Sequence, residues 1–64
     1  MRETELWTRL TKHLGPAYAE VWADQTSVAE LGNRTVREAL RAGVPVKSIW
    51  RAVWALLELP ASER

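Results

Sequence analysis

The side chains that could carry acid–base or metal chemistry form one small group: His13, Glu20 and Asp24. Catalysis would also need a nucleophile, an orienting group and a pocket that excludes water. The 64 residues contain no cysteine, and no glycine-rich phosphate loop is present. A structural zinc site would lack soft ligands other than the single histidine. We therefore expect no enzymatic activity, no cofactor and no metal, with His13 a solvated residue at a helix edge.

A second chemistry-bearing pattern is a row of cations in residues 33–51. These five cations stand against one carboxylate and give the segment a charge of +4, whereas residues 1–32 carry −2. Such a row can follow a phosphate backbone, but a solvated face or a protein partner is the more common explanation. The cations are Arg34, Arg37, Arg41, Lys47 and Arg51.

Two members of this row, Arg37 and Arg41, are spaced i,i+4 and repel each other on a helix. A counter-charge is therefore expected from Glu30, from Glu38 or from a partner's carboxylate.

The first half of the chain predicts two helices. Residues 5–14 have an apolar stripe and Thr4 as a candidate N-cap. Gly15 and Pro16 are typical of a residue that ends one helix and a residue that begins the next, so a second helix is expected over 16–25. We expect Tyr18, Val21 and Trp22 to form its buried face, with Ala19 at the edge.

The second half predicts a loop and two further helices. Residues 26–33 read as a loop with one short turn and a Gly32-Asn33 turn signal. Thr35 and Glu38 have the spacing of a capping box for a short helix over 36–42, which Gly43 closes. The last helix is expected from about Pro45 to just before Pro60, followed by a frayed tail from about residue 60.

Four tryptophans must supply most of the bulk of the core, because the chain has no phenylalanine. An enclosed indole buries about 200 Å², and a domain of this size buries only about 60% of its unfolded surface. The expected core is Trp7, Leu10, Leu14, Tyr18, Trp22, Leu31, Leu40, Ile49, Trp50, Val53 and Leu57.

The last helix carries apolar residues over an arc of about 220°, roughly twice the stripe of a surface helix. It is therefore expected to be central or to be covered by a second molecule. Trp50 is expected in the core, whereas Trp54 lies nearer the polar edge and is a candidate exposed anchor. With Val46 or Leu57 it would form a patch for a homodimer or for another, unidentified protein.

Residues 34–53 also have the outline of a helix-turn-helix, with a small residue, Ala39, four positions before the turn glycine Gly43. A reading helix needs side chains that contact bases, and here only Lys47 and Arg51 qualify. Two helices joined at a glycine are common in small bundles, so we favour an ordinary bundle over DNA reading.

No apolar run approaches the roughly 20 residues that a membrane span needs, and the charged N-terminus is unlike a signal peptide. We expect a soluble, cytoplasmic protein with no membrane association.

Several linked motifs resemble those of an uncharacterised actinobacterial family, the domain of unknown function 3046. They are residues 15–20 (GPAYAE), 22–23 (WA), 29–32 (AELG), 34–36 (RTV), 39–40 (AL), 42–44 (AGV) and 49–53 (IWRAV). The resemblance implies a short helical protein, often encoded near the recombinase RecA and its regulator RecX, and hence a link to DNA repair or recombination. It brings no activity and no site residues.

These observations predict one all-α domain over residues 1–64, a compact bundle of about four short helices with a helix-turn-helix-like second half. The leading hypothesis is a non-catalytic protein-interaction module that self-associates or docks a partner through Val46, Trp54 and Leu57. The alternative is a nucleic-acid-binding protein that uses the basic row.

Overall fold

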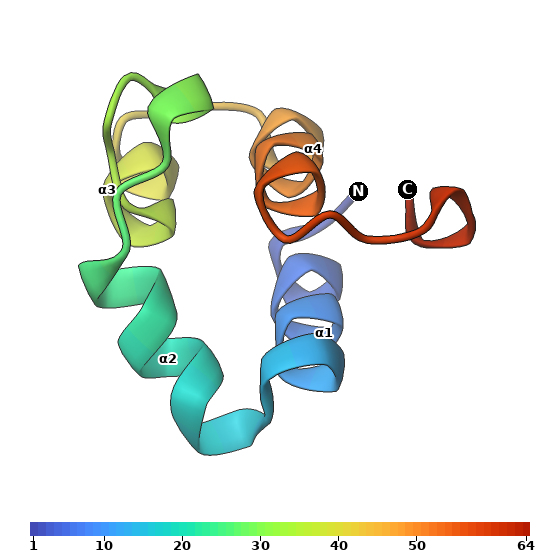
Figure 1. Cartoon of the computed structure of the whole chain (residues 1–64). Coiled ribbons are helices and arrows are strands. Elements are labelled where there is room, and N and C mark those ends of the chain that lie inside the picture. Colours follow the sequence, from blue (N-terminus) through green and yellow to red (C-terminus); the bar gives the residue numbers. More distant parts are fainter.

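The computed structural model describes all 64 residues and confirms an all-α fold. Four α-helices surround one core, with α1 and α2 below α4 and α3 in the view of Figure 1. The last residues of the chain lie outside α4, away from α3. The helices are α1 (Glu3–Leu14), α2 (Pro16–Gln25), α3 (Val36–Arg41) and α4 (Val46–Leu56), and two 3₁₀ turns are η1 (Ala29–Leu31) and η2 (Ala61–Glu63).

Helix α1 begins at Glu3, two residues earlier than predicted, and the assignment of Thr4 as N-cap is wrong. The N-cap is Arg2, whose side chain makes no capping hydrogen bond. Glu3 and Glu5 lie in the first turn, where carboxylates interact favourably with the helix dipole. This charge pattern supports the helix start without a capping hydroxyl.

Gly15 forms the sharp corner between α1 and α2, as predicted. Its φ of 88° and ψ of 151° are open to glycine and costly for other residues. Its amide donates to the carbonyl of Thr11 at 2.8 Å, and its carbonyl accepts from the amide of Ala19 at 2.9 Å. The one residue thus ends α1 and begins α2, with Pro16 at the first helical position.

The predicted buried face of α2 is partly wrong. Ala19, Trp22 and Ala23 are buried, whereas Tyr18 and Val21 are 56% and 47% exposed. The helix carries apolar residues on both sides, so its pattern does not single out an inner face. The two alanines lie inward because their small side chains permit close approach to the core.

The segment between α2 and α3 closes as a compact turn. The Val28 amide donates to the Arg34 carbonyl at 2.9 Å in an isolated antiparallel bridge. Gly32 and Asn33 have φ angles of 73° and 61°, which confirms the predicted turn. The predicted capping box is also present: Thr35 Oγ1 accepts from the Glu38 amide, and Glu38 Oε1 accepts from the Thr35 amide.

Gly43, with a φ of 82°, turns the chain from α3 into α4. Helix α4 ends at Leu56, three residues before the predicted end, because Glu58 adopts a left-handed φ of 52°. The Leu59 amide then donates to the Trp54 carbonyl at 3.1 Å. This reversal sends the last residues back along α4.

The largest fully buried side chain of the core is that of Trp50, which is 1% exposed. Tyr18 is the one member of the predicted core that lies outside it, whereas Trp7, Leu14, Leu40 and Leu57 are partly buried against it. The fully enclosed set is Leu6, Leu10, Ala19, Trp22, Ala23, Val28, Leu31, Val36, Ala39, Ile49, Trp50, Ala52 and Val53.

Candidate functional site

The C-terminal tail, residues 60–64, is held against α4, so the prediction that it frays is wrong. The indole Nε1–H of Trp50 donates to the carbonyl of Glu63, and that of Trp54 donates to the carbonyl of Pro60, each at 2.9 Å. Buried indoles normally find an acceptor for this N–H. The tail supplies both acceptors and forms the turn η2.

The side chain of Glu63 ties the tail to α1. Its Oε1 accepts a 2.7 Å hydrogen bond from Lys12 Nζ. The Lys12 hydrogen bond, opposed by burial, lowers the pKa of the Glu63 carboxyl below its ordinary 4.5. Ion pairing of an acid with a cation has this direction because it favours the charged form.

His13 lies beside the same carboxylate, and the expectation of a solvated residue is wrong. Its side chain is 19% exposed, and its ring stacks on Trp50 with centroids 6.1 Å apart. Nε2 approaches Glu63 Oε1 to 2.9 Å but lacks hydrogen-bond geometry. Asp24, which sequence reasoning grouped with His13, instead pairs with Arg37. No group of three His, Cys, Asp or Glu side chains is placed to hold a metal.

The predicted interface patch on α4 packs largely against other residues of the same chain. Val46, Trp54 and Leu57 are partly buried and pack against the core, and the Trp54 N–H is bonded to the tail. The wide apolar arc of α4 is thus covered in large part by the chain itself. Leu56, 47% exposed, is the large apolar side chain that α4 leaves in solvent.

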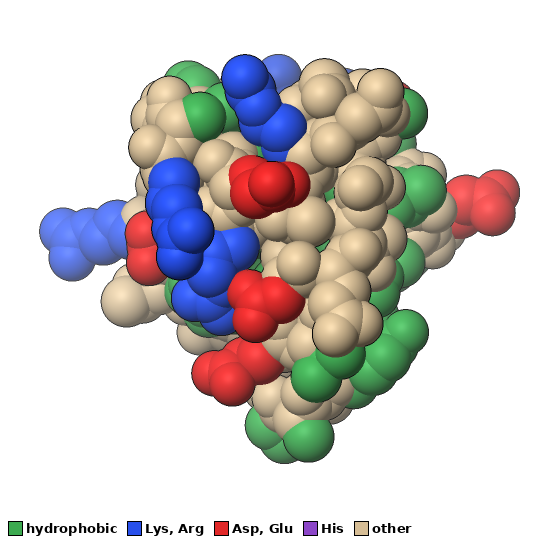
Figure 2. Space-filling model, turned by 90° about the vertical axis from the view of Figure 1, so that its left-hand side faces the viewer, with side chains coloured by type: hydrophobic (Ala, Val, Ile, Leu, Met, Phe, Trp, Pro, Cys, Tyr) green, Lys and Arg blue, Asp and Glu red, His purple; other side chains and the backbone are tan.

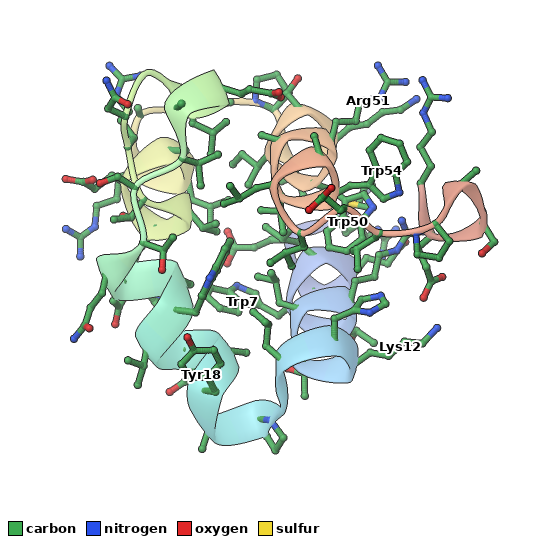
Figure 3. All side chains as sticks on the ribbon, viewed as in Figure 1. Trp7, Lys12, Tyr18, Trp50, Arg51 and Trp54 are labelled. Atoms are coloured by element: carbon green, nitrogen blue, oxygen red, sulfur yellow. The ribbon has the colours of Figure 1, made fainter.

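A different helix presents apolar side chains outward. Tyr18 and Val21 lie one turn apart on α2, and Ala17, on the same side, is also exposed. Figure 2 shows hydrophobic surface gathered at the lower right of the face that carries α2 and α3. Tyr18 points outward from α2 in Figure 3. We call Ala17, Tyr18 and Val21 the α2 face.

The structure divides the predicted basic row into two parts. On the α3 side, the Arg37 guanidinium pairs with Asp24 and lies 4.9 Å from the centre of the Trp7 ring. The expected counter-charge therefore comes from α2, and Glu38 serves the capping box. Figure 2 shows cations and carboxylates intermixed on this side. Arg34 and Arg41 are exposed here.

On the α4 side, Lys47 and Arg51 lie near two cations that do not belong to the predicted row. Arg9 from α1 and Arg64 from the tail line the same open depression, with Trp50 beneath and Glu5 as its one acidic side chain. We call Arg9, Lys47, Arg51 and Arg64 the basic depression. No local pattern marks Arg9 or Arg64. The one feature that could have placed Arg64 here is that two indole N–H groups each need an acceptor, which the tail supplies.

Fold and surfaces together define a small all-α domain with an apolar helix face and a basic depression on separate sides. No helix is long and apolar enough to cross a membrane. A family model described as "Protein of unknown function (DUF3046)" matches residues 1–62, and the chain belongs to this family. No curated protein matches the chain, and no solved structure does.

Proposed function

We propose that this protein is a non-catalytic interaction module that docks an amphipathic helix of a partner protein on the α2 face. The observation that carries the proposal is the exposure of Tyr18 and Val21, at 56% and 47%, on adjacent turns of one helix. A helix that is apolar on both sides is normally covered on both sides. The chain itself covers only the side formed by Ala19, Trp22 and Ala23.

The chemistry of the partner follows from the flank of the α2 face. Glu20 and Asp24 lie along one side of it and are exposed. Asp24 is paired with Arg37, whereas Glu20 takes part in no ion pair. A partner helix with Lys or Arg beside its apolar stripe complements this flank. A second copy of the chain in antiparallel packing would bring the unpaired Glu20 carboxylates of the two copies to the same side, which is repulsive.

Tyrosine suits this role because its ring supplies apolar contact area and its hydroxyl tolerates water before docking. Aromatic residues are also enriched in interface cores. The genomic neighbourhood that the family resemblance implies makes proteins of DNA repair and recombination the first partners to test.

The experiment compares three baits in native lysate: wild type, the double variant Tyr18→Ser plus Val21→Ser, and Leu56→Ser. Leu56 is the matched control, because it is as exposed as Val21 but lies on α4. Thermal unfolding of each bait verifies that the fold is retained. A protein captured by wild type and by Leu56→Ser, and lost with the double variant, is then purified for measurement of its Kd.

Loss of the two side chains is expected to weaken binding by at least about tenfold. Equal capture by all three baits would place the docking surface elsewhere. Concentration-dependent sedimentation that the double variant abolishes would show that the occupant is a second copy of this chain.

A further inference from the structure

A feature that the docking proposal does not use is the basic depression between α1, α4 and the tail. We propose that Arg9, Lys47, Arg51 and Arg64 bind the phosphate backbone of a nucleic acid. This inference goes beyond the α2 face, and it stands or falls independently of it.

The cations converge from three segments that are distant in sequence. Arg9 lies on α1, Lys47 and Arg51 lie one turn apart on α4, and Arg64 ends the tail. Figure 3 shows Arg51 reaching out from α4 toward the side on which the tail lies. Docking of the tail through Trp50 and Trp54 is what brings the fourth cation to the site.

The depression has an unbalanced charge. Glu5 is its one acidic side chain, and its Oε2 lies 3.7 Å from Arg9 Nη2. Lys47, Arg51 and Arg64 take part in no ion pair. On the α3 side, by contrast, Arg37 is paired with Asp24. An anion that enters the depression therefore meets three cationic side chains that are paired with no acidic side chain.

Two of the arginines are held by aromatic rings. The guanidinium carbon of Arg9 lies 5.4 Å from the centre of the Trp50 ring, and that of Arg64 lies 5.6 Å from the centre of the Trp54 ring. Arg9 also donates to the carbonyl of Arg64 at 3.3 Å. A guanidinium that rests on a ring keeps N–H groups at its edge, where their fork geometry matches phosphate oxygens.

The shape of the depression favours a polymer over a small metabolite. It is open, and the side chains that line it are charged apart from those of Met1 and Trp50. Sites for small molecules are mostly apolar clefts with a few placed polar groups. An open surface with several cations instead suits a chain of evenly repeated phosphates, whose counterions are released on binding.

The experiment measures fluorescence anisotropy of a labelled oligonucleotide of about 16 nucleotides, single-stranded and duplex, titrated with the full chain. The test variant is Lys47→Gln plus Arg51→Gln, and the matched control is Arg34→Gln plus Arg41→Gln. All four side chains are exposed and lack ion pairs, so both variants lose the same charge and neither breaks a contact of the fold.

Wild type is expected to bind, with duplex affinity falling about 40-fold between about 50 mM and 200 mM salt if three phosphates are contacted. The test variant is expected to weaken binding at least about tenfold, and the control at most about threefold. Absence of binding at low salt, or equal losses in the two variants, would overturn the proposal. Competition by polyglutamate as effective as by unlabelled oligonucleotide would overturn it in favour of an acidic protein segment.

Discussion

The indole Nε1–H of Trp50 lies 2.9 Å from the main-chain carbonyl of Glu63 and donates a hydrogen bond to it. Trp50 is the largest fully buried side chain of the protein, so this bond links the core to the last residues of the chain. Trp54 makes the equivalent bond to Pro60 one helical turn later. The two indoles together hold the tail along α4.

The bond from Trp54 to the tail is expected to contribute to stability. Trp54→Phe removes the N–H donor but keeps an aromatic ring, and it should lower the free energy of unfolding by about 1 kcal/mol, measured by urea denaturation. A chain that ends at Leu59 should also be less stable. Since both changes remove the same bond, their combined effect should be smaller than their sum. Full additivity would show that the bond contributes nothing.

The carboxylate of Glu63 should make stability depend on pH. Its pKa is lowered below 4.5 in the folded protein, chiefly by the hydrogen bond from Lys12. A lowered folded-state pKa means that the stabilisation is complete above the unfolded value, and that it is lost as pH falls through the folded value. Glu63→Gln should therefore lower Tm near neutral pH, and the difference from wild type should shrink below about pH 4.5.

The control for this pH series is Glu20→Gln, because the Glu20 carboxylate is exposed and unpaired. It should leave Tm nearly unchanged across the series. If the Tm of Glu63→Gln stays below that of wild type by the same amount down to acid pH, the ion pair with Lys12 is not the source of the difference.

The capping box of α3 should contribute to the free energy of unfolding although the helix is short. Six residues do not form a stable helix alone, and Thr35 is 8% exposed. Thr35→Val keeps the shape and removes the hydroxyl, and it should lower the free energy of unfolding by about 1–2 kcal/mol. Thr35→Ser keeps the hydroxyl and should cost less. The reverse order, found by chemical denaturation, would contradict a capping role.

Local features of the fold were predictable because they depend on neighbouring residues. Gly15 at the corner, the Gly32-Asn33 turn and the Thr35–Glu38 capping box all follow from backbone preferences and side-chain reach over a few positions. The core position of Trp50 followed from its place near the centre of the apolar arc. Each of these predictions is confirmed.

The errors at Tyr18 and at the tail have a common physical origin, since both depend on contacts between distant segments. Tyr18 was placed in the core because α2 is apolar on both sides, and only packing against α1 and α3 decides which side is inner. The tail was expected to fray because nothing local holds it. Trp54 precedes its tail partner, Pro60, by 6 residues, and Trp50 and Lys12 precede theirs, Glu63, by 13 and 51 residues.

The candidate sites were harder to predict for the same reason. The basic row looked continuous in sequence, but the fold pairs Arg37 with Asp24 and places Lys47 and Arg51 beside Arg9. The sequence predicts Tyr18 and Val21 to be apolar residues of α2 but assigns them to its buried side, whereas they lie on the exposed α2 face. A charge pattern thus predicts that cations are abundant, whereas tertiary structure decides which of them remain unpaired.

The corner glycine should be the least replaceable of the turn glycines. A Cβ built on Gly15 or on Gly32 would meet no atom within 4 Å, so substitution by alanine tests the backbone conformation alone. Gly32, at φ 73° and ψ 34°, lies in the left-handed region, where alanine costs about 1 kcal/mol. Gly15, at φ 88° and ψ 151°, lies where side chains are nearly excluded and costs reach about 3 kcal/mol.

We therefore expect Gly15→Ala to lower the free energy of unfolding by about 1–2 kcal/mol more than Gly32→Ala. Urea denaturation of the two variants checks this order directly, and equal m-values would show that both unfold the same structure. Replacement of Gly32 by Asn should be tolerated better than by Ala, because Asn adopts the left-handed region more readily. Equal losses for Gly15→Ala and Gly32→Ala would show that the α1–α2 corner relaxes to a different geometry.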